Sequence, residues 1–270
     1  AIGGRPQVQI SLALDGETVD WDNPEAATTV SIPYTPTAEE LANPEYIVVW
    51  FVDDSGVARP VPNGRYDQKA GRVVLKTASS GTYALAYNKV GFDDVSGDAW
   101  YREAVGFIAA RGITSGTGAG NYSPDGRLTR SQCIVLLMNA YGIAPDQTPT
   151  DNFADAGDTW YAGHLSKAKR LGISSGVGDN MFAPDKEITR QELFTMLYNA
   201  LKVIRQLPEG RSGKGLSDFA DAGQIALWAK DAVIVLVETG TIGGSNGNLA
   251  PQSTTTRAEM AQVLYNLLSK

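Results

Sequence analysis

Apolar residues recur with helical spacing in three parts of the chain, and each part opens with the same four-residue pattern. The pattern is Thr-Arg followed by any residue and then Glu or Gln, at residues 129–132, 189–192 and 256–259. From Cys133, Leu193 and Met260 onward, apolar side chains stand at offsets 0, 3, 4, 7 and 8. This spacing predicts three amphipathic α-helices that each bury one stripe of their surface.

The threonine and the acid or amide of this pattern are explained by helix capping. The threonine hydroxyl accepts from the backbone N–H three residues on, and the Glu or Gln side chain reaches back. The arginine is not explained in this way, because the positive end of the helix macrodipole disfavours a cation. Beside free N–H groups, Arg130, Arg190 and Arg257 are expected to form local anion sites. The alternative is an ion pair between each arginine and a neighbouring carboxylate.

The first 89 residues follow a different pattern, with short β-branched and aromatic runs between turn signals such as Asp15-Gly16 and Asn63-Gly64. The predicted strands are Val8–Leu14, Thr28–Tyr34, Tyr46–Asp53, Arg72–Thr77 and Thr82–Asn88. A capping box predicts one short helix at Thr37–Ala42. We expect a small antiparallel sandwich or barrel. Trp21, Trp50 and Tyr66 would either form an aromatic platform for carbohydrate or pack within this module.

From about residue 90 the same series of signals occurs three times, which predicts a helical repeat. Each copy has Phe-x-Asp, a tryptophan on the apolar face of a helix, two glycines, a loop that reaches a proline two residues after Tyr122, Phe182 or Leu249, and then the Thr-Arg helix. In the first copy the helix face would consist of Trp100, Ala104, Phe107 and Ile108. The glycine-rich run at 210–215 is typical of a flexible connector.

Composition narrows the possible functions. The chain has 270 residues, a formal net charge of −7, one histidine and one cysteine. The acidic balance makes a nucleic acid partner unexpected. No apolar run approaches the roughly 20 residues of a membrane span, so we expect no membrane insertion. Cys133 is interpreted as a small core residue. The start, Ala1-Ile2-Gly3-Gly4, looks like an internal cut, and we expect a fragment of a longer protein.

Taken together, these motifs resemble a known family. Residues 92–270 resemble three tandem S-layer homology domains, through Phe-x-Asp, Trp-Tyr, Gly-Ile-x-x-Gly, aromatic-x-Pro-Asp and the Thr-Arg helix start. Residues 1–89 resemble the β module that often precedes such triplets in large exported proteins of Gram-positive bacteria.

The resemblance implies an architecture. We expect an N-terminal all-β sandwich-like module followed by an all-α pseudo-threefold bundle of three repeats. The expected boundaries are 1–90 for the β module and 91–146, 147–208 and 209–270 for the repeats. Grooves between neighbouring repeats would bind ligand.

The resemblance also implies a function, namely non-covalent anchoring of an exported protein to the cell wall or S-layer of a Gram-positive bacterium. The expected partner is a secondary cell-wall polysaccharide that carries a pyruvylated amino sugar, whose ketal bears one carboxylate. Upstream catalytic or S-layer domains are expected in the full-length protein. The chain itself is expected to have no enzymatic activity, catalytic residue, cofactor or metal.

Residue by residue, the resemblance places ligand-binding groups at matching positions of the three repeats. Arginines would bind the carboxylate, aspartates the sugar hydroxyls or the arginine, tryptophans the sugar face, and glycines would let backbone N–H groups approach a sugar. The candidates are Arg130, Arg190 and Arg257; Asp94, Asp155 and Asp221; Trp100, Trp160 and Trp228; and Gly116, Gly176 and Gly244. Each aspartate could equally cap a helix, and each tryptophan could anchor the core. Gln252, Ala229 and the loop at 241–244 depart from the pattern, so one or two working grooves are expected.

Two other functions compete with anchoring. One is a Ca²⁺-dependent surface-lattice or adhesion module, although the Asp-rich loops lack the ligand density of an EF-hand. The other is the C-terminal fragment of a secreted glycoside hydrolase with catalysis elsewhere, because the chain has no Ser/His/Asp or Cys/His arrangement.

Overall fold

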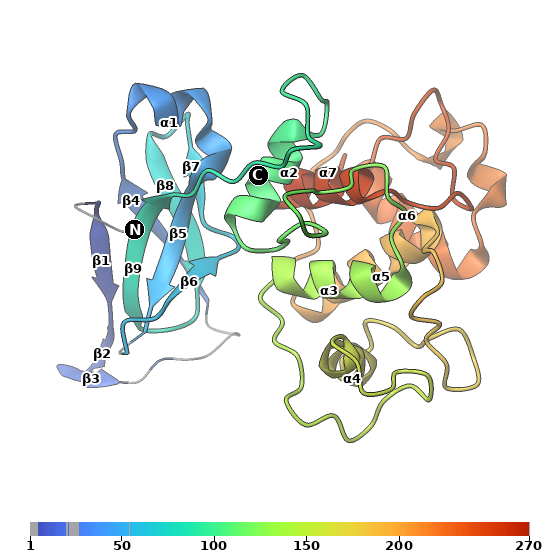
Figure 1. Ribbon diagram of the computed structural model, residues 1–270, viewed down its shortest axis with the longest axis horizontal. Helices are drawn as coiled ribbons and strands as arrows, with labels where there is room; N and C mark the ends of the chain where they lie inside the picture. The colour runs from blue at the N-terminus through green and yellow to red at the C-terminus, as the bar shows by residue number, and fades with distance from the viewer. Residues whose placement is uncertain (1–4, 20, 22–26, 54, 270) are drawn as a thin grey trace. The chain divides into compact units, whose positions relative to one another are not determined.

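The computed structural model describes residues 5–19, 21, 27–53 and 55–269 (Figure 1). The chain forms two compact units, residues 1–122 and residues 123–268. The division falls between Tyr122 and Ser123, inside the segment expected to form the first repeat.

The first unit contains three antiparallel sheets and short helices (Figure 1). Its strands are β1 (Gln7–Ile10), β2 (Leu12–Leu14), β3 (Glu17–Val19), β4 (Thr28–Pro33), β5 (Ile47–Val52), β6 (Ala58–Val61), β7 (Arg65–Asp67), β8 (Arg72–Thr77) and β9 (Gly81–Tyr87). Its helices are α1 (Ala38–Ala42), the 3-10 turn η2 (Pro44–Tyr46) and α2 (Arg102–Ala110). The sheet orders are β1-β9-β5-β6, β4-β8-β7 and β2-β3. As expected, Asp15 and Gly16 turn β2 into β3, with φ of 52° and 87°.

Alternate residues of β5 face two different clusters. Ile47 and Val49 join the core formed with β4, β8 and β9, whereas Val48 packs with Tyr46, Ala86 and Ala110 of α2. The strand is therefore buried on both faces, with a helix covering one of them.

The aromatic platform proposed for this unit does not form as one surface. Trp50 packs against the cluster on the α2 side, whereas Tyr66 packs against the other core, edge-on to Tyr34. The two rings therefore belong to different faces of the module.

Arg111, directly after α2, ties this helix to the sheet. The side chain is 1% exposed. Its Nε donates to the Gly64 carbonyl (3.1 Å), and its Nη2 donates to the Ile47 carbonyl (3.2 Å). Its Nη1 donates to the carbonyls of Glu45 (2.8 Å) and Phe107 (3.0 Å). The guanidinium carbon also lies 3.4 Å from the centroid of the Phe107 ring. Three of these four acceptors lie before residue 90, in η2, in β5 and in the turn between β6 and β7, so the N-terminal module completes the environment of α2.

In the second unit, helices alternate with long loops (Figure 1). The α-helices are α3 (Arg130–Ala140), α4 (Ala162–Arg170), α5 (Arg190–Val203), α6 (Lys230–Glu238) and α7 (Arg257–Leu268). The 3-10 turns are η3 (Leu216–Asp218), η4 (Ala222–Gln224) and η5 (Leu227–Ala229). The buried faces of α3, α5 and α7 contain Cys133, Leu193 and Met260 respectively, as their periodicity predicts. Burial raises the pKa of the Cys133 thiol to about 12, as expected of a core residue.

A closed ring of backbone hydrogen bonds joins the three segments that precede α3, α5 and α7. The Leu128 N–H donates to the Thr255 carbonyl (3.0 Å), and the Thr255 N–H donates to the Ile188 carbonyl (3.1 Å). The Ile188 N–H donates to the Leu128 carbonyl (2.9 Å), which closes the ring. All three residues are buried.

The expected fold class is wrong in both parts. Residues 91–270 do not form an all-α bundle, because extended backbone in β-bridges, such as Thr129 with Glu187 and Thr189 with Thr254, joins the repeats between helices. The N-terminal part is not an all-β sandwich, because three separate sheets occur with α1, η2 and α2. The run at 210–215 is not a free connector either. Ser212 donates from its N–H to the Glu238 carbonyl (2.6 Å) and from its hydroxyl to that of Val237 (2.8 Å).

Thr255 places a polar side chain at the buried ring of backbone hydrogen bonds. Its hydroxyl is buried and has no hydrogen-bond partner among the described residues, whereas the other two ring positions are Leu128 and Ile188. Replacing Thr255 with valine keeps the shape and removes an unpaired polar group. The free energy of unfolding is expected to rise by about 1 kcal/mol. Urea denaturation measures this, with the exposed Thr148→Ala as a control expected to be neutral; a loss of stability in Thr255→Val would show that the hydroxyl is paired.

Candidate functional site

The first amides of the Thr-Arg helices are occupied. The Arg130 N–H donates to the Lys186 carbonyl (2.9 Å) and that of Ser131 to the Pro184 carbonyl (3.0 Å). The first two amides of α5 likewise donate to the carbonyls of Ser253 and Pro251, and the first two amides of α7 donate to the carbonyls of Gly126 and Pro124. The next amide N–H donates to the hydroxyl oxygen of the capping threonine, and the predicted capping boxes form at Thr129 and Thr189. The expectation of free N–H groups is therefore wrong, and an anion must be held by side chains.

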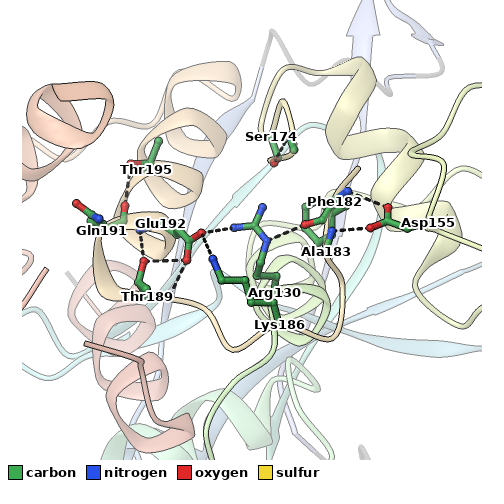
Figure 2. A network of polar contacts seen from close by, with 11 residues as sticks. Arg130, Asp155, Ser174, Phe182, Ala183, Lys186, Thr189, Gln191, Glu192 and Thr195 are labelled. Atoms are coloured by element: carbon green, nitrogen blue, oxygen red, sulfur yellow. Dashed lines mark hydrogen bonds and ion pairs between the residues drawn. The ribbon is translucent and has the colours of Figure 1, made fainter. Parts of the chain in front are cut away.

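The Arg130 side chain lies in a polar network between two repeats (Figure 2). Its Nε donates to the Phe182 carbonyl (2.8 Å), and Nη1 donates to Glu192 Oε1 (3.0 Å). The guanidinium carbon is 4.8 Å from the centroid of the Phe182 ring. Two of the three nitrogens are thus fixed, and within the described residues no partner is recorded for Nη2. By contrast, all three nitrogens of Arg111 have acceptors.

Asp155 holds the loop to which Arg130 binds. Its two oxygens accept from the N–H groups of Phe182 (2.8 Å) and Ala183 (2.7 Å) (Figure 2). Asp221 holds Leu249 and Ala250 in the same way, at 2.8 and 2.6 Å. In the first unit, Asp94 accepts from the Tyr122 N–H (2.7 Å). These aspartates orient a loop carbonyl, a role that sequence reasoning missed.

Burial and ion pairing determine the protonation states of Arg130 and Glu192. Burial lowers the pKa of Arg130, and the charges of Glu192 and Asp155 oppose that shift. An arginine remains protonated at neutral pH in any protein environment. Burial raises the pKa of the Glu192 carboxyl, but the backbone and hydroxyl of Thr189 and the charges of Arg130 and Lys186 lower it below its ordinary value. Both groups are therefore ionised at neutral pH.

A cleft of about 500 Å³ opens beside this network. Its lining brings together three of the predicted residues, Arg130, Gly176 and Trp228, each from a different repeat. Hydroxyl and amide groups complete it; they belong to Ser174, Ser175, Thr195 and Asn199. The Glu192 carboxylate, paired with Arg130, also lines the cleft. This size and this mixture of an ion pair, an aromatic ring and several hydroxyls can accommodate a sugar.

The glycine in the cleft is required by the backbone. Gly176 has φ of +79°, and a Cβ there would lie 2.2 Å from the Met181 carbonyl oxygen and 2.8 Å from the Phe153 ring. Gly116 and Gly244 are in equivalent contacts with the Asn121 and Asn248 carbonyls. At each of these glycines the missing side chain leaves room for a loop of the chain itself, and at Gly176 this loop contact shapes the wall of the cleft.

Gly176→Ala is expected to destabilise the protein by about 2–4 kcal/mol, through left-handed backbone strain and a clash with a fixed carbonyl. Gly172→Ala is the matched control, since φ is +73° and nothing lies within 4 Å of a Cβ. The control should lose only about 1 kcal/mol. Denaturant titration of both variants tests this; equal losses would contradict the steric argument.

The tryptophans are not core anchors, and they do not lie on the apolar helix faces. Trp100, Trp160 and Trp228 are 63%, 64% and 58% exposed. Trp100 and Trp160 precede α2 and α4, and each packs edge-on against the tyrosine that follows it. Trp228 lies in η5, which is held by the Ala226 N–H donating to Gln191 Oε1 of α5 (3.0 Å). Its exposed ring is available to a ligand in the cleft.

Several cleft residues were not predicted. Ser174 Oγ accepts from the Gly176 N–H (3.1 Å), and no acceptor for its hydroxyl proton is recorded among the described residues. Asn199 donates to the Ile173 carbonyl (3.1 Å) and so fixes the loop that carries the serines. A signal for this asparagine existed, because an asparagine stands nine residues after each arginine, at Asn139, Asn199 and Asn266.

Arg190 repeats the geometry of Arg130 on α5. Its Nε donates to the Leu249 carbonyl (2.8 Å) and its Nη1 to Glu259 Oε1 (3.0 Å). Arg257, at the start of α7, is buried, and its N–H donates to the Gly126 carbonyl (2.9 Å). Ligand binding at these two arginines stays a prediction.

The described residues contain neither a metal-binding cluster nor a membrane-spanning helix. Within them, no group of three or more His, Cys, Asp or Glu side chains could hold a metal ion. Among the described helices, none is both long and apolar enough to cross a membrane.

Comparison with known proteins identifies the repeated segments. The family model of the S-layer homology domain matches residues 91–133, 152–194 and 218–261. The chain carries three S-layer homology domains. A further N-terminal module precedes them.

Similar proteins include both enzymes and surface-layer proteins. An amylopullulanase of Thermoanaerobacterium thermosulfurigenes is 26% identical over 99% of this chain, and exoglucanase XynX of Acetivibrio thermocellus is 30% identical over 86%. The surface-layer 125 kDa protein of Lysinibacillus sphaericus is 33% identical over 64%. The chain spans only 14%, 20% and 14% of these relatives.

S-layer homology domains are non-catalytic modules that anchor proteins to the cell wall. With relatives that are S-layer proteins of Gram-positive bacteria, they place this chain at the cell surface in association with the wall. Some relatives are named as enzymes, an amylopullulanase and an exoglucanase.

Proposed function

We propose that the S-layer homology domains anchor an exported protein by binding secondary cell-wall polysaccharide, and that the Arg130 cleft holds an acidic, pyruvylated amino sugar of that polymer. The observation that carries the proposal is a buried guanidinium with one nitrogen left for a ligand, in a cleft built from three repeats.

The arginine is fixed before any ligand arrives. Asp155 fixes the Phe182 loop, and the Phe182 carbonyl and Glu192 then fix two of the guanidinium nitrogens. A ligand carboxylate would therefore meet a donor whose orientation costs no further side-chain entropy. The Arg130 side chain is only 3% exposed, so its interaction with a carboxylate is weakly screened by water.

The rest of the cleft suits the sugar ring. The Trp228 ring offers an apolar face, and Ser174 and Thr195 offer hydroxyls near it. Carbohydrates present both an apolar ring face and hydroxyl groups, so an aromatic ring and a few convergent polar groups are the expected recognition elements.

In this proposal, the segment attaches the rest of a longer protein to the cell wall. Relatives named for amylopullulanase and exoglucanase activity contain a matching segment within much longer chains. We propose that this segment likewise tethers another domain of its protein, with a carbohydrate-active enzyme or an S-layer domain as the two cargo classes.

Cosedimentation with purified cell walls tests the anchoring proposal. The chain should pellet with walls of a Gram-positive bacterium that carries pyruvylated polysaccharide, and it should remain in solution when the walls have been stripped chemically of that polymer. Equal pelleting with intact and stripped walls would show that the polysaccharide is not the partner.

A further inference from the structure

We propose that Glu192 competes internally with an acidic ligand for Arg130, and that Lys186 reduces this competition, so that this pair sets the affinity of the cleft for a negatively charged sugar. The inference rests on the proposed function and concerns how the same cleft selects its ligand.

The contacts show two cations on one carboxylate. Glu192 Oε1 accepts from Arg130 Nη1 at 3.0 Å and lies 3.4 Å from Lys186 Nζ (Figure 2). Glu192 lines the cleft together with Arg130. A second carboxylate that approaches Arg130 would therefore be repelled by Glu192, and Lys186 offsets part of that repulsion.

The next arginine lacks this arrangement. Arg190 pairs with Glu259 at the same 3.0 Å, but the position of Lys186 in the third repeat is Ser253. The Arg190 pair is also more exposed, with side-chain exposures of 17% and 34% against 3% and 14% for Arg130 and Glu192. Of the two arginines, only Arg130 has a carboxylate partner that also pairs with a lysine. Its electric field is also less screened by solvent than that of Arg190.

Other charged groups lie near the Arg130–Glu192 pair. Asp185 and Glu187 flank Lys186 in the chain, and both are exposed. Asp155 also acts on Arg130, but its oxygens are committed to the N–H groups of Phe182 and Ala183. Apart from Arg130 itself, Lys186 is therefore the group whose removal changes the electrostatic potential at Glu192 most directly.

The chain itself supplies a conservative substitution for Glu192. The equivalent residue of the first repeat is Gln132, which forms the same capping box with Thr129. Glu192→Gln should therefore keep the start of α5 while it removes one negative charge from the cleft.

Isothermal titration with purified wall polysaccharide tests the inference, using the pyruvylated polymer and the same polymer after chemical removal of pyruvate. Glu192→Gln should bind the pyruvylated polymer about tenfold more tightly, and Lys186→Gln about threefold more weakly, because Lys186 is 55% exposed and screened. Lys214→Gln, the same charge change in the exposed 210–215 run, should leave the affinity within about twofold of wild type. None of the three should alter binding to the depyruvylated polymer.

If wild type binds the pyruvylated polymer and Glu192→Gln and Lys186→Gln bind it equally well, the competition is overturned and the anchoring function stands. If Glu192→Gln weakens binding, Glu192 contacts the ligand favourably, which also overturns the inference. If wild type binds neither polymer, the proposed function fails together with it.

Discussion

Replacing Arg130 with methionine is expected to weaken binding of pyruvylated wall polysaccharide about 100-fold. A charge-assisted hydrogen bond to a carboxylate contributes about 1.5–3 kcal/mol, and Glu192 would keep only Lys186, at 3.4 Å, as a cationic partner beside the ligand. Titration calorimetry gives the affinity, and the depyruvylated polymer should show a much smaller change.

The same substitution should also lower stability. Breaking a buried ion pair by removing one partner typically costs about 3–5 kcal/mol, and the Phe182 carbonyl loses its donor as well. Stability loss and ligand loss must therefore be separated by a control. Ser131→Ala removes the neighbouring buried hydrogen bond to the Pro184 carbonyl (2.9 Å) without touching the cleft.

Ser131→Ala should thus be less stable than wild type but bind the polymer normally. If Arg130→Met binds as wild type does, the arginine has only a structural role. If Ser131→Ala loses binding to the same degree, the effect of Arg130 is a consequence of general destabilisation.

The second large effect is expected at Arg111. Arg111→Met should destabilise the first unit by about 3–5 kcal/mol, because a guanidinium that serves four buried carbonyls is removed and those carbonyls lose a donor. Denaturant unfolding, followed together with amide hydrogen exchange of β9, measures the loss.

Arg59→Met is the control for the loss of an arginine from the same unit. Arg59 lies on β6, its side chain is 69% exposed, and it pairs with Asp53 at 3.2 Å. It should change stability by less than about 1 kcal/mol. A loss below about 1 kcal/mol in Arg111→Met would contradict the view that α2 depends on the β strands.

This dependence gives the N-terminal module a role beyond spacing. Without residues 1–89, Arg111 would keep the Phe107 carbonyl and lose the acceptors at Glu45, Ile47 and Gly64. The first helix of the first S-layer homology domain is thus built on the module that precedes it in the chain.

Local signals predicted the local structure well. The capping boxes at Thr129 and Thr189 and the buried stripes behind them appear as their spacing requires, because both depend on residues within one or two turns. The strand at 47–52 was also expected. Its continuous apolar run, Ile47-Val48-Val49, is typical of burial on two faces, yet nothing local identifies α2 as the second cover.

Longer-range features were not predicted. The ring of hydrogen bonds among Leu128, Ile188 and Thr255 pairs backbone groups that lie 60 or more residues apart in the chain, and backbone pairing leaves little trace in side-chain chemistry. For the same reason, the occupation of the helix amides by the loop of the next repeat was missed. The tryptophans were misplaced because α2 begins at Arg102, so Trp100 belongs to the turn before the helix.

Of the candidate site residues, the structure brings Arg130, Gly176 and Trp228 to one cleft. The partner of Arg130 could be named only as a neighbouring carboxylate, since Glu192 had already been explained as a cap. One carboxylate in fact serves both purposes, with Oε2 on the Thr189 amide and Oε1 on Arg130.

The most direct test of the central claim is calorimetric titration of the wild-type chain with pyruvylated wall polysaccharide, beside the depyruvylated polymer. Binding through the Arg130 cleft predicts saturable binding of the pyruvylated form and at least about tenfold weaker binding of the other, given the strength of a charge-assisted hydrogen bond. Equal affinity for both forms would contradict recognition of the carboxylate by Arg130.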